Sequence, residues 1–90
     1  MSTRQTKLRD ALVNGFPEAS IEIEDDSARH AGHASAGGGG HFNVNVIWPG
    51  FEGLNRVARH RAVYAAAGDL MQTEIHALAV VAQTPEEVAH

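Results

Sequence analysis

Apolar residues near the beginning of the chain recur every three or four positions. Leu8, Ala11 and Leu12 follow this spacing, which is typical of a helix that buries one face. Gly15 comes shortly afterwards, and glycine is a common stop signal at the end of a helix. The pattern therefore predicts a helix over residues 3–14.

The next two segments alternate between apolar and polar residues, which is the period of a strand with one covered face. Ile21 and Ile23 alternate with glutamates, and residues 41–48 form a second, longer segment. Residues 26–40 between them show neither period and are rich in glycine and histidine. Because glycine loses much backbone entropy on folding, we expect residues 26–40 to form a long flexible loop between two antiparallel strands.

A second helix is predicted in the middle of the chain, from about residue 54 to about residue 70. Two candidate core stripes run along this helix. One consists of Val57, Tyr64, Ala67 and Met71, and the other of Arg56, Arg59 and Val63. Gly68 is expected to weaken the last turn by roughly 1 kcal/mol relative to alanine. The spacing leaves open which stripe faces the core.

The end of the chain predicts a third strand and a short helical turn. Residues 75–82 are apolar on both faces except at His76, as expected of a central or well-covered strand. Thr-Pro-Glu-Glu at residues 84–87 has the spacing of a capping box, with proline at the first helical position. We therefore expect the chain to close with a short helix.

Together these elements predict a single α+β domain over residues 1–90. Their order is helix, strand, strand, helix, strand and short helix. A strand-helix-strand crossover favours a right-handed return to a parallel neighbour. We therefore expect a three-stranded mixed sheet with helices on one face.

Composition and charge narrow the possible chemistry. The chain has 90 residues, a formal net charge of −4 and no cysteine. Without cysteine it can form no disulfide, thiol nucleophile or thiolate-ligated iron-sulfur cluster of its own. No phosphate-binding loop, catalytic triad or paired-carboxylate motif is recognisable, so we do not expect an enzyme. There is no signal-peptide pattern and no apolar run of about 18 residues, so the default location is the cytoplasm or an organelle matrix, away from membranes, and we expect the cytoplasm.

Histidines are the remaining candidate metal ligands. His30 and His33 lie in the glycine-rich loop, where they are either solvated residues or a flexible ligand arm. His76 interrupts an apolar strand, so it is either a hydrogen-bonded structural residue or a ligand. His41, at the base of the loop, could equally be a hydrogen-bonding residue at a strand edge. The His-x-x-His pair alone is a weak zinc signal.

A basic cluster on the second predicted helix consists of Arg56, Arg59 and Arg61. It is either a solvated face that balances the acidic residues or a surface for phosphates or an acidic partner. Gly-Phe-Glu-Gly at residues 50–53 matches the GxxG pattern of RNA-clamping KH domains, although Glu52 would repel a phosphate. The net negative charge also argues against a surface that binds nucleic acid over its whole extent.

Six short motifs, in this order, are similar to the successive signatures of the BolA family. They are His-Ala-Gly-His at 30–33, Gly-His-Phe-Asn-Val at 40–44, Phe-Glu-Gly at 51–53, Arg-His-Arg-Ala-Val-Tyr at 59–64, Ile-His-Ala-Leu at 75–78 and Thr-Pro-Glu at 84–86. The resemblance covers about residues 5–88. It implies a KH-like fold of class II, in agreement with the predicted order of helices and strands.

The resemblance also implies a function. Members of the family are partners of monothiol glutaredoxins, with which they share a 2Fe-2S cluster in iron-sulfur trafficking or iron sensing. By position, His76 matches the family's C-terminal histidine ligand, and His30 matches the loop ligand best, with His33 as a competitor. The thiolates would come from the glutaredoxin cysteine and from glutathione, so the isolated chain need not hold a cluster. A homodimer is the expected alternative when the partner is absent.

A second function is implied by relatives that act as DNA-binding transcriptional regulators of stress response and cell morphology. In these relatives the second helix has been likened to a recognition helix. Here Arg56, Arg59 and Arg61 support that alternative, whereas the net charge and Glu52 oppose it. Our leading hypothesis is therefore a non-enzymatic adaptor that docks a glutaredoxin through the face around the second helix and third strand.

Overall fold

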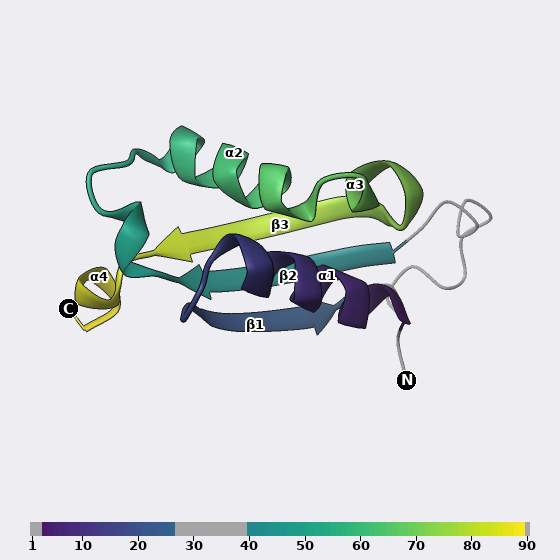
Figure 1. Ribbon diagram of the computed structural model, residues 1–90, viewed down its shortest axis with the longest axis horizontal. Coiled ribbons are helices and arrows are strands. Elements are labelled where there is room, and N and C mark those ends of the chain that lie inside the picture. Colours follow the sequence, from purple (N-terminus) through teal and green to yellow (C-terminus); the bar gives the residue numbers. More distant parts are fainter. Residues whose placement is uncertain (1–2, 27–39, 90) are drawn as a thin grey trace.

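The computed structural model describes residues 3–26 and 40–89, and the helices and strands of these two stretches form an α+β domain (Figure 1). In chain order the elements are α1 (Thr3–Gly15), β1 (Ser20–Asp25), β2 (Gly40–Ile47), the 3-10 helix η3 (Pro49–Phe51), α2 (Arg56–Ala67), α3 (Leu70–Thr73), β3 (Ile75–Gln83) and α4 (Pro85–Ala89). This order confirms the predicted succession of helices and strands. The predicted flexible loop lies outside the described residues, apart from its two ends.

The sheet has the order β1-β2-β3. β1 pairs with β2 in antiparallel orientation, and β3 pairs with β2 in parallel orientation, as the lengths of the connections predicted. β3 is thus an edge strand of the described sheet, and the prediction of a central or well-covered strand is wrong. Its outward-facing residues include two small alanines, Ala77 and Ala79, and Val81, which is 51% exposed. An apolar run therefore does not require burial on both faces here, because much of it is alanine.

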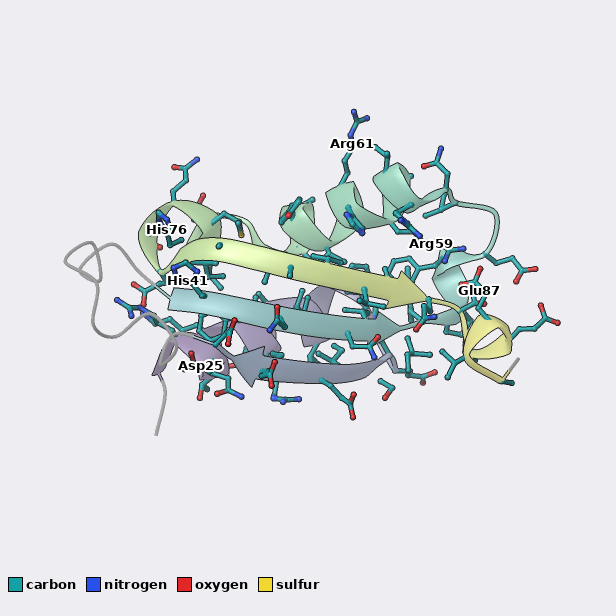
Figure 2. All side chains as sticks on the ribbon, turned by 180° about the vertical axis from the view of Figure 1, so that it is seen from behind. Asp25, His41, Arg59, Arg61, His76 and Glu87 are labelled. Atoms are coloured by element: carbon teal, nitrogen blue, oxygen red, sulfur yellow. The ribbon has the colours of Figure 1, made fainter. Side chains whose placement is uncertain are left out.

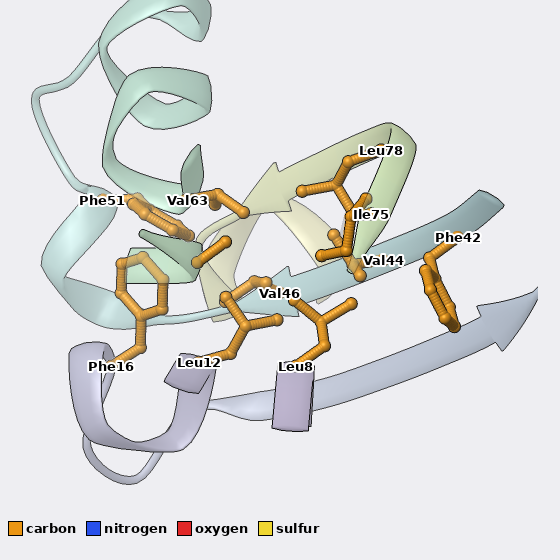
Figure 3. Close-up of a cluster of buried hydrophobic side chains, with 11 residues drawn as sticks. Leu8, Leu12, Phe16, Phe42, Val44, Val46, Phe51, Val63, Ile75 and Leu78 are labelled. Carbon is orange, nitrogen blue, oxygen red and sulfur yellow. The ribbon is translucent and has the colours of Figure 1, made fainter. Parts of the chain in front are cut away.

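Helices α1 and α2 lie on the same face of the sheet, while Figure 2 shows the opposite face from behind. On β2 every second residue from Gly40 to Val46 is buried, so the helix-covered face follows the strand period. These residues join side chains from both helices in one core (Figure 3). The core consists of Leu8, Leu12, Phe16, Phe42, Val44, Val46, Phe51, Val63, Ala67, Ile75 and Leu78.

The second helix faces the core through one residue from each of its two candidate stripes, so neither stripe is confirmed as a whole. Val63 and Ala67 are buried, whereas Val57 and Tyr64 are 57% and 40% exposed. The helix ends at Ala67, because Gly68 adopts a φ of 57° that other residues rarely tolerate. The predicted continuation to about residue 70 is therefore wrong, and a separate short helix, α3, follows instead.

Gly15 belongs to α1 and does not stand beyond its end. A Cβ atom at this position would lie 2.7 Å from the Cβ atom of Ala66 on α2. Glycine is therefore required by the close approach of two helices, and the interpretation of Gly15 as a stop signal is only part of its role. The contact fixes α1 against α2 over the sheet.

Candidate functional site

His76 is the additional residue of a β-bulge at the beginning of β3. Gly40 pairs with Ile75, and the next residue of β2, His41, pairs with Ala77. One step along β2 thus corresponds to two steps along β3, and His76 is the residue without a direct partner in this register. Bulges in parallel pairs are rare, and bulges often redirect a side chain near a functional site.

The bulge explains how the beginning of β3 can be apolar and still carry an exposed histidine. Ile75 and Leu78 are both buried although they are three positions apart, and His76 and Ala77 between them are exposed. A regular strand would place Ile75 and Leu78 on opposite faces. His76 is thus exposed and does not interrupt a covered strand, while its role as a structural residue or a ligand stays a prediction.

The structure brings His76 next to His41. Their ring centroids lie 5.1 Å apart, with an angle of 46° between the ring planes. Both residues lie at the end of the sheet where β2 begins, as Figure 2 shows, and Asp25 lies at the same end. The backbone carbonyl of His41 accepts a hydrogen bond of 2.7 Å from the N–H of Asp26, which ties β1 to this end.

The spacing of the two rings is suitable for holding one metal ion. A histidine nitrogen lies about 2.0–2.1 Å from a bound metal such as zinc, so two rings that share a metal at a tetrahedral or square angle have centroids roughly 4.5–5.2 Å apart. The observed separation of 5.1 Å falls in this range. In residues 3–26 and 40–89 no group of three or more potential ligands is assembled, and the pair offers two imidazoles.

Two of the predicted ligands, His30 and His33, lie outside the described residues. The sequence leaves the role of His41 open and does not predict its proximity to His76. The signal that would have found it is the register between β2 and β3. Register depends on the bulge, and the bulge depends on which apolar residues enter the core.

The predicted basic cluster is divided by the contacts of Arg59. Its Nε donates a hydrogen bond to the carbonyl of Leu54 at 2.8 Å, and its Nη1 donates one to the carbonyl of Ala82 at 3.1 Å. The same guanidinium forms a bidentate pair with the carboxylate of Glu87, at 2.7 and 3.0 Å, and lies 5.9 Å from the centre of the Phe51 ring. Arg59 thus joins α2, β3 and α4, and four hydrogen bonds within the domain engage its guanidinium.

Glu87 has a second function in the predicted capping box. The N–H of Thr84 donates to its carboxylate at 2.9 Å, and its own N–H donates to the Thr84 hydroxyl oxygen at 3.1 Å. The hydrogen bond from Arg59, followed by that from Thr84, lowers the pKa of Glu87 to about 2. The same pair raises the pKa of Arg59. The capping box and the proline at the beginning of α4 are confirmed.

The Gly-Phe-Glu-Gly segment at 50–53 serves the core. Phe51 is fully buried, and its ring contacts Phe16 and Trp48 at centroid distances of 5.3 and 5.4 Å. Gly53 has a φ of 82°, which glycine favours. The segment is therefore an aromatic anchor between β2 and α2, and its contacts account for its sequence without a phosphate ligand.

None of the helices in the described part of the chain is both long enough and apolar enough to cross a lipid bilayer.

The comparisons with known proteins agree with one another. A family model described as "BolA-like protein" matches residues 12–87. "Protein BOLA1, chloroplastic" of Arabidopsis thaliana is 40% identical over 91 residues, which are 97% of this chain and 57% of that protein. "SufE-like protein 1, chloroplastic/mitochondrial" of the same plant is 38% identical over 94 residues, which are 98% of this chain and 25% of that protein. The chain thus spans about half the length of the first relative and about a quarter of the length of the second.

The fold agrees as well. The solved structure of the "BolA domain of SufE1" from Arabidopsis thaliana superimposes with a TM-score of 0.83 and 36% identity, covering 97% of this chain and 98% of that one. The three-stranded mixed sheet and its helices are therefore shared with a protein of related sequence. The names of both curated relatives refer to organelles, so the cytoplasmic location stays a prediction.

Proposed function

Because the chain belongs to the BolA-like protein family, we propose that it is an adaptor in iron-sulfur cluster trafficking or iron sensing. In this proposal it binds a monothiol glutaredoxin and shares a 2Fe-2S cluster with it through histidine ligands. The relative named as a SufE-like protein carries a similar domain, which supports a role close to iron-sulfur chemistry. The cluster is cargo that passes between partners.

The pairing of His41 and His76 is the observation that carries the proposal. Two imidazoles with a centroid separation of 5.1 Å, in a chain without cysteine, can supply two nitrogen ligands and no thiolate. Thiolates from a glutaredoxin cysteine and from glutathione would complete the shell. Two histidines on one iron is the ligation found in Rieske centres.

The position of His76 suits a shared cluster better than a permanent one. His76 is exposed at the end of the sheet, so a partner protein can approach it without opening the core. His30 and His33 are the proposed ligands from the loop, and His41 is the imidazole that already lies beside His76. One of these three supplies the second nitrogen.

A reconstitution experiment tests the proposal. The protein is mixed with a monothiol glutaredoxin, glutathione, ferrous iron and sulfide, and the visible absorption and circular dichroism of the complex are recorded. We expect His76→Ala to abolish the spectrum of the mixed complex. His60→Ala is the matched control, because His60 lies on α2 and not at the bulge. An unchanged spectrum with His76→Ala would overturn the ligand assignment.

The same variants identify the second ligand. His30→Ala, His33→Ala and His41→Ala are compared under identical conditions, and we expect only one of them to match the loss caused by His76→Ala. If none of the three alters the spectrum, iron is held by His76 alone on this side. In that case the two-histidine form of the proposal is wrong.

The alternative of a DNA-binding regulator has weaker support. Of Arg56, Arg59 and Arg61, the guanidinium of Arg59 is already bonded to Glu87 and to two backbone carbonyls. Phosphate binding would have to rely on the other two or break these bonds. Specific DNA complexes usually depend on several phosphate contacts, so we retain the adaptor as the proposed function.

A further inference from the structure

The free edge of β3 is partly covered by side chains of α2. The hydroxyl of Tyr64 donates to the carbonyl of Leu78 at 3.0 Å, and Arg59 donates to the carbonyl of Ala82 at 3.1 Å. These two carbonyls therefore point away from β2. In an edge strand, alternate residues direct both N–H and C=O outward, so Val80 between them does the same.

Val80 consequently presents an unused pair of backbone groups. No side chain in the described stretches bonds to its N–H or its carbonyl, whereas the carbonyls two residues before and two residues after it are capped. Gln83, three residues after Val80, should face β2 by the same alternation. Its carbonyl accepts a hydrogen bond of 2.9 Å from the N–H of Trp48, which follows β2, and this bond confirms the alternation. The edge can thus accept one residue of an additional strand, in a fixed register.

A groove of about 610 Å³ runs along this edge, between the end of β3 and the beginning of α2. Leu54 and Val81 give it an apolar surface and are 39% and 51% exposed. Arg56 and His60 lie on the α2 wall, and neither has a hydrogen-bond or ion-pair partner among the described residues. Arg59 also lines the groove, but Glu87 neutralises it.

We propose that this groove binds an extended peptide segment of a partner protein, which pairs its backbone with Val80 and places a carboxylate side chain at Arg56 and His60. An extended peptide can accept a hydrogen bond from the N–H of Val80 and donate one to its carbonyl, as in the addition of a strand to a sheet edge. A carboxylate matches a guanidinium and an imidazole that have no internal acid. An apolar side chain next to the carboxylate would cover Leu54 and Val81.

A peptide fits this groove better than a nucleic acid. A phosphodiester chain carries one charge per nucleotide, and the groove offers Arg56 as its unneutralised arginine. Arg61 does not line the groove and projects away from the sheet (Figure 2). Glu87 neutralises Arg59, so a phosphodiester chain with several charges would find too few free cations in the groove.

The groove and the histidine pair are separate sites. His41 and His76 lie at one end of the sheet, and Arg59 and Glu87 lie at the other end (Figure 2). Binding of a peptide to β3 does not require a cluster, and cluster ligation does not require the groove. The proposal can therefore fail while the adaptor function stands, and the reverse also holds.

The experiment selects a ligand and then maps it. A phage library of random ten-residue peptides is selected against the full chain, and the most enriched peptide is synthesised and titrated into ¹⁵N-labelled protein. We expect enriched peptides to contain an acidic residue beside β-branched or aromatic residues. We expect the largest shifts at the amides of Leu78, Val80 and Ala82.

Charge-reversal variants test the carboxylate contact. We expect Arg56→Glu to weaken binding of the selected peptide by at least about tenfold, as for loss of a charge-assisted hydrogen bond. Arg61→Glu is the matched control and should leave the affinity within twofold, because the two arginines share a helix and Arg61 is outside the groove. Glutamate at the first turn of α2 favours the helix dipole, so Arg56→Glu should remain folded. His76→Ala should leave peptide binding unchanged.

Four results would overturn the proposal. One is that no peptide is enriched above phage selected on an empty surface, and another is that the shifts map away from β3. A third is equal weakening by Arg56→Glu and Arg61→Glu, which indicates general attraction to charge. The fourth is stronger perturbation of the same amides by a random single-stranded DNA oligonucleotide or by raising the protein concentration alone. These last outcomes would assign the edge to a nucleic acid or to a second copy of the chain.

Discussion

The imidazole rings of His41 and His76 lie with their centroids 5.1 Å apart, next to the bulge that joins the beginnings of β2 and β3. The bulge keeps His76 and Ala77 on the uncovered side of the sheet and returns Leu78 to the core. Packing of the core and presentation of His76 are therefore consequences of one local irregularity. A change that removes the bulge should affect both.

Cluster retention by the mixed complex should depend on pH. A histidine nitrogen must be unprotonated to bind iron, and the ordinary histidine pKa is about 6.5. We therefore expect the visible circular dichroism of the complex between this chain and glutaredoxin to decline as the pH falls below about 6.5. The control is the same glutaredoxin with a cluster held by thiolates alone. Equal pH profiles for the two would show that imidazoles do not hold the cluster.

The pair between Glu87 and Arg59 should make stability depend on pH in the acidic range. The pKa of Glu87 is about 2 in the folded chain and close to its ordinary value of 4.5 when the chain is unfolded. Between these values the unfolded state binds more protons, so the free energy of unfolding falls as the pH falls from about 4.5 towards 2. Urea denaturation at pH 6 and pH 3 measures this loss.

Glu87→Gln should reduce that pH dependence and should already lower stability at pH 6. Glu86→Gln is the matched control, because Glu86 is the exposed neighbour in the same turn of α4. It should leave both the stability at pH 6 and the slope between the two pH values almost unchanged. Equal slopes for the wild type and Glu87→Gln would mean that other carboxylates cause the acid response.

Gly15→Ala should destabilise the protein although alanine is the better helix former. The propensity gain is about 1 kcal/mol, but the new methyl group would lie 2.7 Å from the Cβ atom of Ala66. Separating α1 from α2 opens the core, so we expect a net loss of about 1–2 kcal/mol in the free energy of unfolding. Chemical denaturation measures it.

The double variant Gly15→Ala with Ala66→Gly is the control for that contact. It removes the second methyl group, so most of the loss should be recovered apart from the cost of glycine within α2. The comparison is between the loss in free energy of unfolding of the double variant and the sum of the two single losses. If the loss of the double variant equals or exceeds that sum, steric contact between the two positions does not explain the requirement for glycine.

The elements with a clear period were predictable from the sequence, and their tertiary relations were not. Leu8 and Leu12 on α1 and the alternation along β2 are local patterns, and the structure buries these residues as expected. The edge position of β3 depends on the absence of a fourth described strand, which no local pattern contains. The proximity of His41 and His76 depends on register, which is fixed by long-range packing.

The second helix shows the same division. Its existence and its approximate start follow from the spacing of apolar residues. The structure adds the cap by Asn55, whose side chain accepts from the N–H of Ala58 at 2.8 Å. Which residues of its two candidate stripes enter the core depends on the position of the sheet. Likewise, Arg56, Arg59 and Arg61 are equivalent in the sequence, but Arg59 differs from the other two in its bonds to β3 and α4.

That difference between the arginines gives the last prediction. Arg59→Ala removes the bonds that join α2 to β3 and α4, and it leaves the carboxylate of Glu87 without its main partner. We therefore expect Arg59→Ala to lower the thermal unfolding midpoint, and Arg61→Ala, whose side chain is exposed, to leave it unchanged. Circular dichroism during heating measures both. If the two variants have the same midpoint, the network around Arg59 does not stabilise the fold, and the guanidinium is then available for a ligand such as a phosphate, as the DNA-binding alternative requires.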